Sequence, residues 1–221
     1  MRIVLSFAFK LLVFSLSALG VYLTVKDSTY PLEVFSYYTT IVNVMTILLF
    51  ALLLILMVVR KNSPPIVRFF KQSLMVQLIL TLFVYSFVLI PYITEQQIEY
   101  QIFSIEDIII HYATPIAVLL DYAWFDEKGK FKSGYIITNF FNLLAYVVYL
   151  VIYVFFGGRF HTGGTVSIYP YYFLNIENVG LQPFIFICLA IIAVVVFIGW
   201  VVYMVDQLLG VTLTLTPTKR K

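Results

Sequence analysis

The sequence predicts an all-α polytopic membrane protein with six transmembrane helices and both termini in the cytoplasm. Of its 221 residues, 62% are hydrophobic and only 11% are charged, against about 45–50% and about 25% in soluble domains. Six apolar segments each approach or exceed the roughly 20 residues that cross a bilayer. Basic residues gather on one side of these segments. We therefore expect one six-helix transmembrane domain over residues 1–221.

The six expected helices cover residues about 3–25, 36–59, 70–93, 105–125, 135–156 and 183–209. No A-x-A-like cleavage site follows the first apolar segment, so we expect this helix to be retained as a signal anchor. The second helix ends at RKNSPP (60–65), since paired prolines cannot continue a helix. The fourth and fifth are separated by FDEKGKFKSG (125–134), and the fifth and sixth by a long connection over 157–183.

The distribution of basic residues predicts the orientation. Of the 14 lysines and arginines, all except Lys26 and Arg159 fall on the side that carries the two termini. Because cytoplasmic loops are enriched in basic residues, this side is expected to be cytoplasmic, and we expect a multi-pass protein of the plasma membrane. Lys10 lies within the first helix near this side, and we expect its side chain to extend toward the lipid headgroups.

The fourth expected helix carries polar residues where a lipid-facing helix would have none. Asp107, His111, Thr114 and Asp121 follow the spacing i, i+4, i+7 and i+14, which places them on one face. Ionisable residues within membrane spans normally face the interior of the bundle. Pro115 removes a backbone hydrogen bond to the carbonyl of His111 and predicts a kink. Asp121 lies near the cytoplasmic end, where we expect it to anchor a lysine of the following loop outside any chemistry.

The second expected helix opens with hydroxyl and amide side chains. Thr39, Thr40 and Asn43 share one face through i+4 and i+3 spacing. This helix and the fourth both enter from the outer side, so the threonines and His111 lie at similar depth. A histidine there can take the hydroxyl proton and make a threonine nucleophilic. In the alternative interpretation, each threonine bonds back to its own helix and His111 joins two helices by a hydrogen bond.

The remaining polar residues favour no other chemistry. Asn139 and Asn142 in the fifth helix form either a packing face with polar hydrogen bonds or part of a cavity wall. Two histidines, His111 and His161, and one cysteine, Cys188, predict neither a disulfide nor a metal site, and we expect no cofactor. The net charge of +3 resides in membrane-flanking loops, so we expect no nucleic-acid partner.

Three stretches in order resemble a known family: YYTTIVN (37–43), HYATPIAVLLDYAWF (111–125) and YPYYFLNIENVG (169–180). Together they resemble bacterial six-span membrane proteins related to the androgen-induced membrane protein family. Animal members are threonine hydrolases that cleave fatty acid esters of hydroxy fatty acids. The resemblance implies that Thr39 or Thr40 is the nucleophile and His111 the base. The aromatic pair and the Thr-x-Ile pattern favour Thr39, whereas the spacing to the downstream polar residue favours Thr40.

Three hypotheses on function follow. The first is an intramembrane lipid-ester hydrolase, in which Asn43 or a tyrosine of the external loop stabilises the oxyanion and Asp107 orients His111. The second is a non-enzymatic lipid- or small-molecule-binding membrane protein or a transporter, favoured by the polar stripe. The third is a structural or assembly partner. Membrane lipids are the expected partners. The residues expected to support the site or contact a substrate are Asn43, Asp107, Thr114, Asn139, Asn142 and Tyr171.

Overall fold

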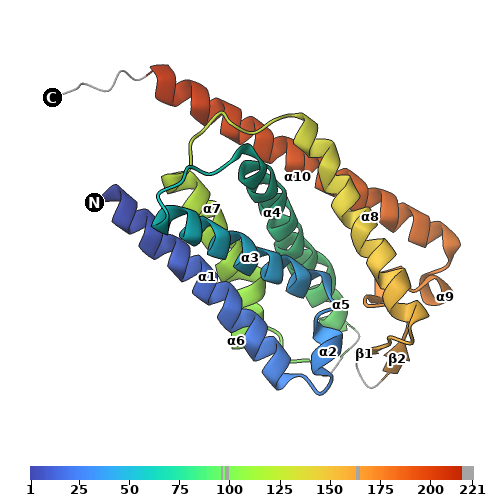
Figure 1. Ribbon diagram of the computed structural model, residues 1–221. Helices are drawn as coiled ribbons and strands as arrows, with labels where there is room; N and C mark the ends of the chain where they lie inside the picture. The colour runs from blue at the N-terminus through green and yellow to red at the C-terminus, as the bar shows by residue number, and fades with distance from the viewer. Residues whose placement is uncertain (96, 98–99, 163–164, 216–221) are drawn as a thin grey trace.

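The computed structural model describes residues 1–95, 97, 100–162 and 165–215, and it confirms the all-α membrane architecture (Figure 1). Within these residues, six helical spans are long and apolar enough to cross a bilayer. The chain is therefore a multi-pass integral membrane protein. The spans are Arg2–Asp27, Tyr38–Val58, Pro65–Glu95, Ile105–Phe125, Gly134–Phe155 and Leu181–Thr212.

Four of the spans are continuous α-helices, and two are interrupted by a π-helical turn. The continuous helices are α1 (Arg2–Asp27), α3 (Tyr38–Val58), α8 (Gly134–Phe155) and α10 (Leu181–Leu215). The third span consists of α4 (Pro65–Val84), the π-turn η1 (Tyr85–Leu89) and α5 (Ile90–Glu95). The fourth consists of α6 (Ile105–Ile108), the π-turn η2 (Ile109–Ala113) and α7 (Thr114–Phe125).

Short elements connect the spans at one end of the bundle. They are the helix α2 (Pro31–Val34), the antiparallel strands β1 (Phe160–Thr162) and β2 (Thr165–Ser167), the 3₁₀ turn η3 (Tyr172–Leu174) and the helix α9 (Ile176–Val179). At the opposite end, α3 stops before the two prolines. Pro65 then begins α4, where its missing N–H removes no helical hydrogen bond.

The bundle has two chemically distinct ends (Figure 1). The start of α1, the end of α10 and the loops 59–64 and 126–133 lie at one end, which we call the lysine-rich end. The other end carries α2, the β-hairpin, α5, α6 and α9, and we call it the tyrosine-rich end. Among the described residues, only Lys26 and Arg159 place basic side chains near the tyrosine-rich end. The two-sided distribution of charge is thus a property of the fold.

The core lies where α1, α3, α4 and α7 pack together, and α8 and α10 pack against each other and against α4. Fully buried apolar side chains from these four helices fill it: Val13, Phe50, Val76, Leu78 and Val118. By contrast, α8 buries only Asn139 and Leu150. The buried polar residues of the spans, such as Asn43, Asp107 and Asp121, lie inside the bundle among these helices.

A polar network joins α8 to α4. Asn139 is fully buried, and its Oδ1 accepts hydrogen bonds from Ser73 Oγ at 3.1 Å and Gln77 Nε2 at 3.2 Å. Asn142 Nδ2 donates to Ser73 Oγ at 2.6 Å. Gln77 also accepts from the hydroxyl of Tyr38 on α3. Both asparagines therefore hold helices together in this structure.

Candidate functional site

The third and fourth spans change geometry in the same way, one residue before a proline. In η1, the N–H of Ile90 bonds to Tyr85 O, and Pro91 follows. In η2, the N–H of Thr114 bonds to Ile109 O, and Pro115 follows. A proline supplies no N–H to the preceding turn, so the helix can widen there at little cost in hydrogen bonds. Each span therefore has a π-turn within the tyrosine-rich half of the bundle.

The two π-turns place Tyr85 and His111 face to face. Their rings stack with centroids 3.8 Å apart and an interplanar angle of 11°. The Tyr85 hydroxyl donates to Asp107 Oδ2 at 2.7 Å, and the Tyr100 hydroxyl donates to Asp107 Oδ1 at 2.6 Å. His111 Nε2 lies 4.0 Å from Asp107 Oδ1, beyond hydrogen-bond distance. We call Tyr85, Tyr100, Asp107 and His111 the Asp107 cluster.

Three members of the Asp107 cluster are closed off from solvent, whereas the fourth, Tyr100, is 47% exposed. Tyr85, Asp107 and His111 are each no more than 6% exposed. The carboxylate carries a hydrogen bond on each oxygen, which is how a buried charge is normally stabilised. Tyr100 lies outside the spans, and burial beside this carboxylate raises its pKa, so the phenol stays a hydrogen-bond donor at physiological pH.

The polar stripe predicted for the fourth helix is confirmed. Asp107, His111, Thr114 and Asp121 are all buried. Pro115 was predicted to free the carbonyl of His111, four residues earlier. In the π-turn the backbone bonds run to the fifth preceding residue, so the carbonyl freed by Pro115 is that of Ile110. Asn43 Nδ2 donates at 3.2 Å to the carbonyl of Ile110, where the prediction had named His111.

The two candidate nucleophiles lie in different surroundings. Thr39 lines a cavity at the tyrosine-rich end, whereas Thr40 is 3% exposed and is not part of that wall. Within the described part of the chain, neither hydroxyl makes a hydrogen bond to His111, whose Nδ1 has no partner. Both N–H groups of Asn43 are engaged, by Thr39 O at 2.9 Å and by Ile110 O. No hydrogen bond therefore joins either threonine hydroxyl to His111 in this structure.

The cavity has a volume of about 360 Å³ and lies between α3, α4, α8, α10 and the loop around η3. Leucine, isoleucine, valine and phenylalanine side chains form most of its wall. Its hydroxyl-bearing wall residues are Tyr38, Thr39, Thr81, Tyr85, Tyr146 and Tyr171. His111 and Asp107 do not line the cavity. The ring of Tyr85 stands between the cavity and His111, because it lines the first and stacks on the second.

Tyr171 fixes the 157–183 connection to the start of α3. Its hydroxyl accepts a hydrogen bond at 3.1 Å from the backbone N–H of Tyr38, which begins that helix. Burial raises the pKa of Tyr171 to about 12. The phenol is therefore neutral at physiological pH, and it brings a polar atom to the cavity without a charge.

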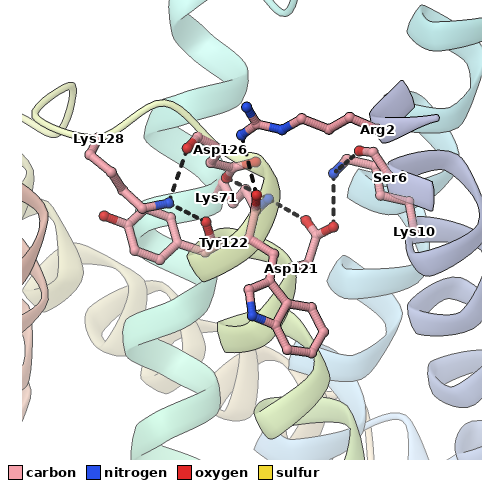
Figure 2. Close-up of polar contacts among 9 residues, drawn as sticks. Arg2, Ser6, Lys10, Lys71, Asp121, Tyr122, Asp126 and Lys128 are labelled. Atoms are coloured by element: carbon pink, nitrogen blue, oxygen red, sulfur yellow. Dashed lines mark hydrogen bonds and ion pairs between the residues drawn. The ribbon is translucent and has the colours of Figure 1, made fainter. Parts of the chain in front are cut away.

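The lysine-rich end contains a second polar centre (Figure 2). Asp121 is fully buried, and its two oxygens bind two lysines: Lys10 Nζ at 2.8 Å and Lys71 Nζ at 2.5 Å. Lys71 also pairs with Asp126 at 2.5 Å. Lys10 bonds in addition to Ser6 Oγ at 3.2 Å. We call Lys10, Lys71, Asp121 and Asp126 the Asp121 cluster. Its ion pairs join α1, α4 and α7.

Two predictions about these charges were wrong. Lys10 does not extend to the headgroups, since it is 5% exposed and turns inward to Asp121. Asp121 anchors lysines of two other helices and none of the following loop. In that loop, Lys128 Nζ donates to the backbone carbonyls of Tyr122 and Asp126. Burial lowers the pKa of Lys128. The loop lysine thus binds backbone carbonyls, and Asp121 takes its partners from two helices that pack against α7.

Asp206 on α10 holds the 126–133 loop in place and was not singled out from the sequence. Its Oδ1 accepts from the Tyr122 hydroxyl at 2.7 Å, and its Oδ2 accepts from the Phe131 N–H at 2.8 Å. The carbonyl of Asp206 accepts from the Gly129 N–H at 3.0 Å. The position of a lone acidic residue inside the last apolar segment was the available signal.

The remaining findings concern metals and relatives. Among the described residues, no group of three or more His, Cys, Asp or Glu side chains is placed to hold a metal ion.

No protein-family model, curated protein or solved structure matches the chain. The fold and the two polar centres define a six-span helical membrane protein with an apolar cavity at one end and a buried charge cluster at the other.

Proposed function

We propose that the protein binds an uncharged single-chain lipid, with the acyl chain in the cavity at the tyrosine-rich end. The observation that carries this proposal is the composition of the cavity wall. Aliphatic and aromatic side chains form it, and the described lining residues include no charged side chain. Ligand pockets of about 300–1,000 Å³ are usual, and this cavity is at the small end of that range. A single chain suits this volume better than a two-chain phospholipid.

The wall chemistry also selects the head of the lipid. Tyr38, Thr39 and Tyr171 meet where α3 begins, and each carries a neutral hydroxyl. An ionised head placed there would lack a counter-charge, which is costly in an apolar site. An alcohol, ester or amide would instead exchange hydrogen bonds with these groups. The ligand class is therefore a neutral lipid with a small polar head.

Cys188 gives a direct test, because it lines the cavity and is the only cysteine of the chain. A long-chain fatty acyl ester added to protein in detergent micelles is expected to slow the reaction of Cys188 with a maleimide. The matched control moves the thiol to an outward position on the same helix, with Cys188→Ala combined with Val196→Cys. Val196 is 38% exposed and does not line the cavity, so its labelling rate should not change. Equal rates with and without ester at Cys188 would overturn the proposal.

Cavity-filling variants provide a second measurement. Leu143→Trp and Ile191→Trp both place an indole in the wall and should weaken binding of a tritiated acyl ester at least tenfold. Val196→Trp adds the same indole outside the cavity and should bind as the wild type does. If both wall variants retain full affinity, the lipid occupies another place.

A lipid-ester hydrolase is the second candidate, favoured by the position of Thr39 in the cavity wall and by the family resemblance. Attack by the Thr39 hydroxyl on an ester carbonyl would give an acyl-threonine and release the alcohol, and water would then release the acid. His111 would accept the hydroxyl proton only after the Tyr85 ring moves aside, since that ring now covers the imidazole.

The hydrolase is tested by turnover of the same acyl ester and by covalent labelling with a reactive acyl probe. Thr39→Ala should abolish both, whereas Thr40→Ala should retain them, because Thr40 is outside the wall. Undiminished turnover in His111→Ala would exclude the histidine as the base. Absence of turnover in the wild type, with Cys188 still protected by ester, would leave lipid binding as the function.

We further propose that the lysine-rich end faces the cytoplasm, in the plasma membrane. The concentration of basic residues at this end supports the orientation. A reporter enzyme that is active only outside the cytoplasm, fused to the C-terminus, should be inactive. The same reporter inserted after Glu177 in the loop of the opposite end should be active. The reverse pattern would refute the orientation.

A further inference from the structure

Among the residues that the structure describes, four side chains have buried polar atoms with no hydrogen-bond partner. These atoms are Asn43 Oδ1, His111 Nδ1, Thr114 Oγ1 and both amide atoms of Gln72. All four residues are at least nine-tenths buried. Because buried polar groups in folded proteins are nearly always hydrogen-bonded, each such atom requires an explanation. A bound water or ligand is the usual explanation for such an atom.

Three of these residues belong to one neighbourhood. Asn43 Nδ2 donates to the carbonyl of Ile110 at 3.2 Å, which places the Asn43 amide against the π-turn η2. His111 is the next residue after Ile110. Thr114 follows His111 by three residues, directly after the same π-turn, so both belong to one widened segment of the span. Gln72 lies on α4 beside Lys71 of the Asp121 cluster, toward the other end, and it does not belong to this group.

We propose that Asn43, His111 and Thr114 hold one buried water molecule. Asn43 Oδ1 can only accept, the Thr114 hydroxyl both donates and accepts, and His111 Nδ1 does either according to its tautomer. A water that donates to Asn43 Oδ1 and His111 Nδ1 and accepts from Thr114 satisfies all three atoms. Buried waters typically make about three hydrogen bonds of this kind.

The neutral character of the three groups argues for water over an ion. The nearest charge is Asp107, whose two oxygens already bind the hydroxyls of Tyr85 and Tyr100. An unpaired ion at this depth would be poorly stabilised. Three polar atoms without net charge match a single water, which needs two to four polar partners.

The water also fixes the state of His111. If Nδ1 accepts from water, the neutral ring carries its hydrogen on Nε2, which faces Asp107 Oδ1 at 4.0 Å. The imidazole then connects the water on one side with the Asp107 carboxylate on the other. This inference concerns the hydration of the bundle interior and does not depend on whether the cavity binds a lipid.

An isosteric substitution distinguishes a hydrated site from an empty one. Thr114→Val keeps the shape and removes the hydroxyl. If the hydroxyl binds the water, the variant should unfold at a temperature lower by about 2–4 °C. If the site is empty, removal of an unsatisfied hydroxyl should leave the midpoint unchanged or raise it. Gln72→Met is the matched control, and we expect no loss of stability because no water is assigned to its amide.

The tautomer of His111 gives an independent measurement. The chain has two histidines, so a His161→Gln variant leaves a single imidazole for ¹⁵N NMR. We expect the Nε2–H tautomer with Nδ1 as an acceptor, and we expect Thr114→Val to shift the Nδ1 resonance. An Nδ1–H tautomer would overturn the proposal. So would a Thr114→Val variant that is as stable as its parent and leaves the resonance unchanged.

Discussion

The ring of Tyr85 covers the imidazole of His111, with 3.8 Å between the ring centroids. Each residue belongs to a π-turn that is separated from a following proline by one residue, so two local distortions on separate spans produce one contact. Tyr85 also lines the cavity, whereas His111 and Asp107 do not. Any ligand that acts on His111 or Asp107 from the cavity must therefore do so through Tyr85.

The two interactions of Tyr85 can be separated by substitution. Tyr85→Phe keeps the stacked ring but removes the hydrogen bond to Asp107 Oδ2, and we expect a loss of about 1–3 kcal/mol in the free energy of unfolding. Tyr85→Leu also removes the stack and should cost about 0.5–1.5 kcal/mol more. Unfolding in detergent can be followed by the reaction of Cys188 with a thiol-reactive dye. Equal stability of the two variants would show that the stack contributes nothing.

Much of the fold follows from the sequence, because the bilayer limits the choices. Apolar segments of about 20 residues must form helices to satisfy their backbone groups, and their number and order give the six spans. The inward face of the fourth span follows from the spacing of Asp107, His111 and Asp121 alone. Pro115 predicted only a kink, and no prediction was made for the π-turn before Pro91.

The partners of these residues could not be predicted, because they depend on which helices lie side by side. Lys10 and Asp121 are 111 residues apart, and extension toward headgroups was an equally reasonable fate for that lysine. Tyr85 is one of 17 tyrosines, and its stack with His111 and its hydrogen bond to Asp107 become visible only in the folded structure. The position of Thr39 in the cavity wall likewise depends on α8, α10 and the loop around η3.

Asp121→Asn is expected to destabilise the bundle strongly. The substitution leaves two cations, Lys10 and Lys71, buried against a neutral amide. Removing one partner from a buried ion pair typically costs about 3–5 kcal/mol. Asp126→Asn should cost less, because Asp126 is partly exposed and Lys71 retains Asp121. Thermal unfolding in detergent provides the measurement.

A compensated variant tests the same explanation. Lys10→Met, Lys71→Met and Asp121→Leu together remove all three charges and keep similar volumes. We expect stability near that of the wild type, since apolar replacement of a buried charge cluster is often neutral. If this triple variant is as unstable as Asp121→Asn alone, the ion pairs themselves stabilise the fold, beyond neutralising one another's charge.

Gly20→Ala tests the close approach of α1 to η2. A Cβ atom at Gly20 would lie 2.6 Å from Ile110 Cγ2 and 2.8 Å from Ile109 Cγ2, so the π-turn would have to shift. Overpacking of this kind costs about 1–3 kcal/mol. The matched control is Gly134→Ala at the start of α8, where no atom lies within 4 Å of the added Cβ. If the Gly20 variant has the same melting temperature as the wild type, α1 can move away from η2 without loss of stability.

Glu33 is expected to hold the β-hairpin against α2. Its Oε1 accepts from the N–H of His161 at 2.8 Å, and its Oε2 lies 2.7 Å from His161 Nδ1. The Tyr37 hydroxyl donates to the same carboxylate, and the His161 ring stacks on Tyr30 with centroids 3.8 Å apart. Glu33→Gln keeps the shape but removes the charge that strengthens these bonds. Amide hydrogen exchange at His161 should accelerate about tenfold, as expected for a loss near 1.4 kcal/mol.

Glu177→Gln is the control for the hairpin, because Glu177 lies in the same 157–183 connection and, among the described residues, makes no hydrogen bond or ion pair with Glu33 or His161. Its exchange at His161 should match that of the wild type. Faster exchange in both variants would point to a general effect of loop charge. Unchanged exchange in Glu33→Gln would show that packing of Phe160, which is fully buried, holds the hairpin without the ion pair.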